Sequence, residues 1–141
     1  MKKFLLTGNL GGIYIGMPVK SARLLLGSRE DKGCNLTRGW SLEAYADKAL
    51  QVSYYQEVVG LIGLYFDPKN AEPPTLPPNL NCTVPFHGLT TINEVKNYLN
   101  ENNIPWEMNT LLEGTVCIKI GAGISVYFEE GLLSSLLISE R

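Results

Sequence analysis

A pattern that occurs twice constrains this 141-residue chain more than any other feature. Gly16 and Gly88 each lie in an aromatic-x-Gly-apolar motif, "YIGM" and "FHGL", at an offset of 88 − 16 = 72. With one residue inserted, apolar side chains follow at helical spacing in both copies. These positions are Val19, Ala22, Leu25 and Leu26 in the first copy, and Ile92, Val95, Tyr98 and Leu99 in the second. The pattern predicts two short amphipathic helices.

Start and stop signals frame both predicted helices. Pro18 stands in the opening turn of the first, and Gly27 follows its end. Thr91 is placed as the N-cap of the second, Glu94 completes a capping box three residues later, and Asn102-Asn103 marks its end. Each helix has only about ten residues, which is too short for stability without a packing partner. We expect that partner to be a sheet.

Strand patterns follow each predicted helix. Residues 50–59 and 124–133 both show a period-two strand, a short polar turn and an apolar strand, at an offset of 124 − 50 = 74. Further strands are expected at residues 42–46 and 112–120. The chain is therefore predicted to be α+β, with tandem helix plus antiparallel β-hairpin units that share one sheet and place their helices on one face.

The predicted units are residues 1–66 and 86–141, joined by a Pro-rich connector at 67–85. The connector holds six of the eight prolines, which cannot enter a central strand ladder. One helix on one hairpin buries too little surface to be stable, whereas two copies can bury a common core. We therefore expect a single compact domain.

Composition and charge exclude several classes of function. A net charge of −2 gives no basic patch for a phosphate backbone, so no nucleic-acid partner is expected. No apolar stretch approaches the roughly 20 residues that span a bilayer, so no membrane is expected either. The start, "MKKFLLTGN", has a positive head and a short apolar run, but Asn9 and nearby glycines interrupt it and no cleavage site follows. A cytoplasmic location is predicted.

The residues that could carry chemistry are few. His87 is the single histidine, and a dyad with Cys82 or Cys117 would supply a base and a nucleophile. Neither cysteine lies in a recognisable nucleophile turn, and the three cysteines show no metal-binding spacing. A structural imidazole is the favoured interpretation. We expect no catalysis, no cofactor and no metal site, and expect Trp40 and Trp106 to cover edges of the core.

Alternation along the predicted strands defines a surface that the helices cannot cover. If Leu50, Val52 and Tyr54 face inward, and Ile124, Val126 and Phe128 likewise, their neighbours face outward. The predicted partner-binding residues on this outward face are Glu43, Tyr45, Gln51, Ser53, Tyr55, Thr115, Lys119, Ser125, Tyr127 and Glu129. Tyrosine is enriched at protein interfaces, although an antiparallel sheet can also leave one face in water.

The segment "GMPVKSARLLLG" at 16–27 resembles the helix opening of β-lactamase-inhibitor-like and SmpA/OmlA-like modules. That resemblance implies a short helical segment packed on an antiparallel sheet. In the inhibitors, two such modules occur in tandem and their joined sheet binds a target protein. This chain departs from them in lacking paired cysteines and a convincing export signal.

In size, acidity and absence of catalytic motifs the chain is also similar to immunity proteins of bacterial contact-dependent inhibition and other polymorphic-toxin systems. That similarity implies a non-catalytic protein, monomer or homodimer, that neutralises a cognate toxin such as a basic nuclease-type domain. Two alternatives stay open: an envelope assembly or structural module of the SmpA/OmlA type, and a small enzyme that depends on a cysteine and His87.

Overall fold

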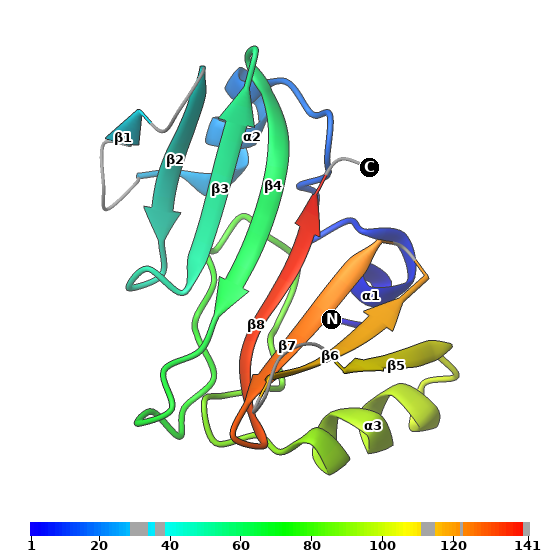
Figure 1. Cartoon of the computed structure of the whole chain (residues 1–141). Coiled ribbons are helices and arrows are strands. Elements are labelled where there is room, and N and C mark those ends of the chain that lie inside the picture. Colours follow the sequence, from blue (N-terminus) through cyan, green and yellow to red (C-terminus); the bar gives the residue numbers. More distant parts are fainter. Residues whose placement is uncertain (29–33, 36–38, 111–114, 122, 140–141) are drawn as a thin grey trace.

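The computed structural model describes residues 1–28, 34–35, 39–110, 115–121 and 123–139. These residues form three helices, α1 (Lys2–Thr7), α2 (Val19–Leu26) and α3 (Ile92–Glu101). The strands are β1 (Cys34–Asn35), β2 (Trp40–Tyr45), β3 (Leu50–Tyr55), β4 (Val58–Tyr65), β5 (Trp106–Thr110), β6 (Thr115–Ile120), β7 (Ile124–Glu129) and β8 (Leu132–Ser139). All eight join one antiparallel sheet in the order β1-β2-β3-β4-β8-β7-β6-β5 (Figure 1). The predicted α+β class is confirmed.

Both predicted helices are present, and their ends follow the sequence signals. At the start of α3, Thr91 Oγ1 accepts a hydrogen bond from the Glu94 N–H at 3.3 Å, and Glu94 Oε1 accepts one from the Thr91 N–H at 3.1 Å. This is the predicted capping box. Helix α2 ends at Gly27, whose φ of +73° lies in the left-handed region. Helix α1 and strands β1 and β5 were not predicted, and residues 112–114 of one predicted strand lie outside the described residues.

Strands β4 and β8 meet at the centre of the sheet with a symmetric register. Gly63 pairs with Leu137, and 137 − 63 = 74 is the offset between the two strand patterns in the sequence. The other pairs lie evenly about this one: Leu61 with Ser139, Ile62 with Ile138, Leu64 with Leu136 and Tyr65 with Ser135. Any antiparallel ladder has such local symmetry, and in this one the central pair, Gly63–Leu137, joins positions that correspond at the offset of 74.

Irregular features recur at the same offset. The β3–β4 register shifts between Ser53 and Tyr54, and the β7–β8 register shifts between Tyr127 and Phe128, 74 residues later. The backbone just before α2 and just before α3 also accepts a hydrogen bond from the start of a strand in the same way. The Val59 N–H donates to Met17 O at 2.8 Å, and the Leu133 N–H donates to Thr90 O at 2.8 Å. The two parts of the chain therefore share local geometry that simple strand alternation does not require.

One core serves the whole sheet. The buried cluster combines strand residues from both sides of the central pair with Ala22 and Leu26 of α2 and with Val95 and Leu99 of α3. Helix α1 adds Phe4 and Leu5, and Figure 1 shows α1 and α2 behind the sheet. The Pro-rich connector is part of this core, because it contributes Leu76, Leu80 and Val84.

The turn between β2 and β3 corrects one part of the sequence prediction. Tyr45 pairs with Leu50, which leaves four residues, 46–49, between them. In the second half Ile120 pairs with Ile124, which leaves only three, 121–123. The extra residue shifts β2 by one position, and a shift of one position moves every side chain to the other face. Glu43 and Tyr45 therefore face the core, at 2% and 1% exposure, and their placement on the outward face is wrong.

The same turn is strained. Ala46, Asp47 and Lys48 all have positive φ, 54°, 54° and 67°. Left-handed backbone costs residues other than glycine roughly 1–2 kcal/mol each. We expect Lys48→Gly to raise the free energy of unfolding by about 0.5–1 kcal/mol, because glycine removes the Cβ clash at some cost in chain entropy. Urea denaturation checks this expectation, with Lys48→Ala as the control that keeps the clash; equal stabilities of the two variants would contradict it.

Candidate functional site

Direct pairing across the sheet identifies the residues that share its uncovered side. Paired residues on adjacent strands point to the same side. One row of such pairs runs through all strands but β1: Ala44, Gln51, Gly63, Leu137, Ser125, Lys119 and Glu107. We call this side of the sheet the open face; it comprises Trp40, Leu42, Ala44, Gln51, Ser53, Tyr55, Val58, Leu61, Gly63, Tyr65, Glu107, Asn109, Thr115, Cys117, Lys119, Ser125, Tyr127, Glu129, Leu132, Ser135, Leu137 and Ser139.

Eight of the ten predicted binding residues lie on the open face. Lys119 and Glu129 are exposed, and Gln51, Tyr55, Thr115 and Tyr127 are half-buried. Ser53 and Ser125 have the predicted orientation, but larger neighbours cover them and leave 4% and 9% of each exposed. The two halves therefore form one continuous surface, with the serines beneath it.

Two aromatic rings lie close to glycines of β4. A Cβ atom added to Gly60 would stand 2.5 Å from the Trp40 ring, and one added to Gly63 would stand 2.6 Å from the Tyr65 ring. Both rings are half-buried. Glycine inside a strand commonly marks such a close approach. These rings, with Leu61 and Leu137 between them, give the open face an apolar and aromatic centre.

Trp40 was expected to cover an edge of the core, but it lies on the open face and stacks on Tyr55. Their ring centroids are 5.1 Å apart and the rings are inclined by 24°. The signal for this placement was present in β4, where Gly60 and Gly63 interrupt an otherwise apolar strand, "VVGLIGLY". Trp106 is different: its indole N–H donates to Asn100 Oδ1 at 3.0 Å, which ties β5 to α3.

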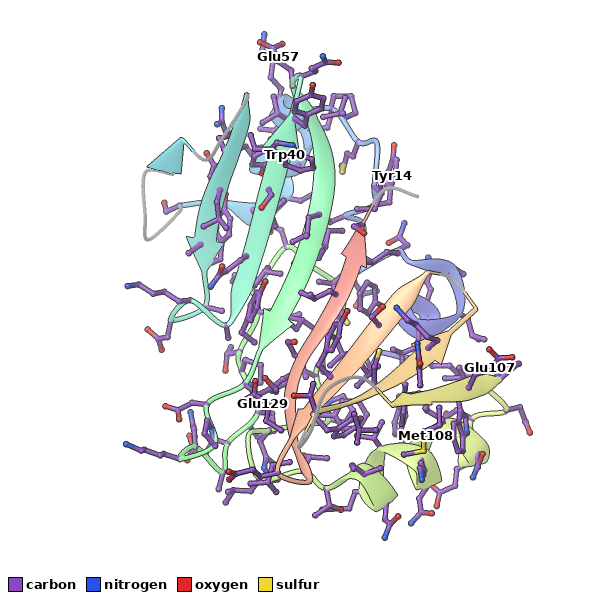
Figure 2. All side chains as sticks on the ribbon, in the orientation of Figure 1. Tyr14, Trp40, Glu57, Glu107, Met108 and Glu129 are labelled. Carbon is purple, nitrogen blue, oxygen red and sulfur yellow. The ribbon has the colours of Figure 1, made fainter. Side chains whose placement is uncertain are left out.

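Carboxylates surround the apolar centre. Figure 2 shows Glu57 at the tip of the β3–β4 hairpin, Glu107 on β5 and Glu129 towards the opposite end of the sheet from Glu57. Lys119 is a basic residue on the open face, and its ammonium group donates a hydrogen bond to Ser125 Oγ at 2.7 Å. These three carboxylates therefore give the rim negative charge at separate places, and Glu107 lies directly across from Lys119.

A polar cluster lies on the core side of the sheet, beneath α2. Glu43 accepts two hydrogen bonds from the Arg23 guanidinium, at 2.7 and 3.2 Å, and one from the Tyr45 hydroxyl at 3.0 Å. The hydrogen bond with Glu43 raises the pKa of Arg23. Burial raises the pKa of Tyr54, and the nearby Tyr45 and Glu43 add to that effect. The Arg23 guanidinium also lies 5.7 Å from the centroid of the Tyr54 ring.

The second half builds the same positions without polar groups. Given the one-residue difference in the turns, Ile118, Ile120 and Phe128 occupy the places of Glu43, Tyr45 and Tyr54. All three are buried in the core. Among the described residues, the corresponding positions of the second half are apolar, so this polar cluster belongs to the first half.

The described geometry brings His87 to neither candidate cysteine. His87 Nδ1 accepts the Leu89 N–H at 3.1 Å, within its own turn. The Cys82 and Cys117 thiols each approach a neighbouring backbone carbonyl at 3.8 Å, and Cys117 is buried in β6. The side chain of Cys34 lies outside the described part of the chain. Nowhere in that part do three or more histidine, cysteine or acidic side chains gather to hold a metal ion.

Across the described residues, no helix combines the length and apolar character needed to cross a bilayer. Comparison of the whole chain with protein-family models, with curated protein sequences and with solved structures gives no match.

Proposed function

We propose that this chain is a non-catalytic, cytoplasmic binding protein that neutralises a cognate toxin by protein-protein contact, as an immunity protein does. The observation that carries the proposal is the open face. It joins both halves, holds half-buried aromatic rings at its centre and has carboxylates at its rim. Aromatic side chains in the centre of a surface, surrounded by polar groups, are the usual composition of a protein-binding site.

We further propose that the halves are tandem copies, residues 1–66 and 86–141, joined by the connector at 67–85 and with their helices on one side of a shared sheet. The pairing of corresponding positions in β4 and β8 and the recurring register shifts support this origin. A single copy would offer only half of the open face. Joining two copies edge to edge doubles the available area without adding a second core.

The charge of the rim favours a basic partner. Glu57, Glu107 and Glu129 lie around the open face, and the whole chain carries a net charge of −2. Complementary charge at the rim mainly speeds association and rejects wrong partners, whereas buried aromatic side chains supply most of the affinity. A basic toxin domain, such as a nuclease, meets both requirements.

A growth assay tests the proposal. The chain is co-expressed with the product of the gene immediately upstream. Growth of these cells is compared with growth of cells that express the upstream product alone. We expect the unchanged chain to restore growth, and expect Tyr127→Ala with Glu129→Lys to weaken binding by about 30-fold and lose much of the protection. The matched control is Leu24→Ala, on the outer surface of α2 at 78% exposure.

Full protection by the open-face variant would show that the contact surface lies elsewhere. Loss of protection by the Leu24→Ala control would place the contact on the helices. If the upstream product is toxic and the unchanged chain gives no protection, the neutralising function itself is wrong for this pair.

A further inference from the structure

A groove of about 590 Å³ lies at one end of the first half, between α2 and the tip of the β3–β4 hairpin. Its walls include an aromatic ring on each side, Trp40 from the open face and Tyr54 from the core side. The polar groups that border it are Arg23, Ser41, Gln56 and Glu57. The groove therefore continues the open face around the end of the sheet.

The charges at the groove do not cancel. Arg23 is neutralised by Glu43, since their closest nitrogen and oxygen are 2.7 Å apart and Glu43 is buried. Glu57 is exposed at the hairpin tip and has no ion-pair partner among the described residues. Within the described part of the chain, a carboxylate without an ion-pair partner thus lies beside an aromatic wall. That combination attracts a cation, because the face of an aromatic ring is electronegative.

The corresponding positions of the second half lack this aromatic pair. Trp40 pairs with Tyr55 across β2 and β3, and Thr115 pairs with Glu129 at the same place across β6 and β7. The offsets are 115 − 40 = 75 and 129 − 55 = 74. The aromatic pair also needs Gly60, since a Cβ atom there would stand 2.5 Å from Trp40, whereas Ser134 occupies that position in β8.

We propose that this groove receives one arginine side chain of the basic partner, with its guanidinium against Trp40 and paired to the carboxylate of Glu57. The inference rests on the proposed function, because it names the chemistry of the partner at one end of the same surface. Guanidinium is favoured over ammonium because it is planar, stacks on aromatic rings and binds a carboxylate through two parallel hydrogen bonds. The protein already holds cations against rings, Arg23 against Tyr54 at 5.7 Å in the wall of this groove and Lys96 against Trp106 at 5.5 Å on α3 and β5.

The experiment needs no natural partner. The probe is the blocked peptide Gly-Arg-Gly, titrated into ¹⁵N-labelled protein while the indole N–H signals of the two tryptophans are followed; a Trp106→Phe sample assigns them. We expect a saturable shift of the Trp40 signal with this peptide, a several-fold weaker response to Gly-Lys-Gly, and none with Gly-Gln-Gly.

A matched pair of variants locates the carboxylate. Glu57→Gln should weaken binding of Gly-Arg-Gly at least five-fold, whereas Glu101→Gln, exposed on α3 and outside the open face, should leave it unchanged. Both residues are exposed, so neither change should affect folding. No saturable shift of Trp40, or equal binding by the two variants, would overturn the inference. Equal binding of the arginine and lysine peptides would overturn the preference for guanidinium.

The outcome is separable from that of the growth assay. If Gly-Arg-Gly fails to bind while the unchanged chain still protects cells, only the arginine receptor is wrong. If Gly-Arg-Gly binds at Trp40 but the chain gives no protection against a toxic upstream product, the groove binds arginine and the proposed partner is wrong.

Discussion

Replacement of Gly88 by alanine is expected to lower the free energy of unfolding by about 4 kcal/mol or more. A Cβ atom at residue 88 would lie 1.5 Å from the carbonyl oxygen of Asp67 and 2.3 Å from its carbonyl carbon. These are backbone atoms, so no side-chain rotation can make room. The segment is also held in place, because the Gly88 N–H donates to Asn70 O at 3.1 Å.

Urea denaturation followed by circular dichroism measures the effect. The control is Gly121→Ala, where an added Cβ meets no atom within 4 Å. It should change stability by less than about 0.5 kcal/mol, as most unobstructed surface substitutions do. Similar losses for the two variants would contradict the packing at Gly88. Gly16, its counterpart in the repeated motif, has open space around it but a φ of +91°, so glycine is required there for a different reason.

Removal of the Arg23 side chain is the second large effect that we expect. Arg23→Ala should cost about 3 kcal/mol, the lower end of the range for breaking a buried ion pair, because Arg23 itself is partly in water. Its partner Glu43 is only 2% exposed, whereas 45% of the Arg23 side chain is exposed. The loss arises mainly from leaving the Glu43 carboxylate in the core without its cation. Thermal and urea denaturation both report it.

A double variant separates the lost attraction from the cost of the buried charge. Arg23→Leu with Glu43→Leu should recover most of the stability, since the second half places Ile118 at the position of Glu43. Lys20→Ala, also on α2 but exposed, is the control and should have little effect. A double variant that is less stable than Arg23→Ala alone would show that the polar cluster is required for folding of the first half.

The parts of the fold that local signals determine were predictable from the sequence. Proline, glycine and the capping box set the ends of α2 and α3, and period-two alternation located β3 and β7. These signals depend only on residues that are close in the sequence, so they can be interpreted without the tertiary structure. The α+β class with an antiparallel sheet follows from them.

The open face was predicted only in part, because orientation depends on turn length. Alternation within β3 and β7 placed Tyr55 and Tyr127 correctly. The orientation of β2 depends on the four-residue turn at 46–49, and composition does not reveal whether such a turn has three residues or four. For this reason the prediction placed Glu43 on the outward face, whereas its side chain is buried on the core side. Trp40 was missed because its place on the open face depends on Gly60, which is distant in sequence.

The most direct test of the central claim is a calorimetric titration of the upstream gene product with two variants of this chain. Tyr127→Ala with Glu129→Lys changes the open face, and Leu24→Ala changes the outer surface of α2. We predict that the first binds about 30-fold more weakly than the unchanged chain and that the second binds equally well. Unchanged affinity of the open-face variant, or a loss confined to Leu24→Ala, would contradict the account.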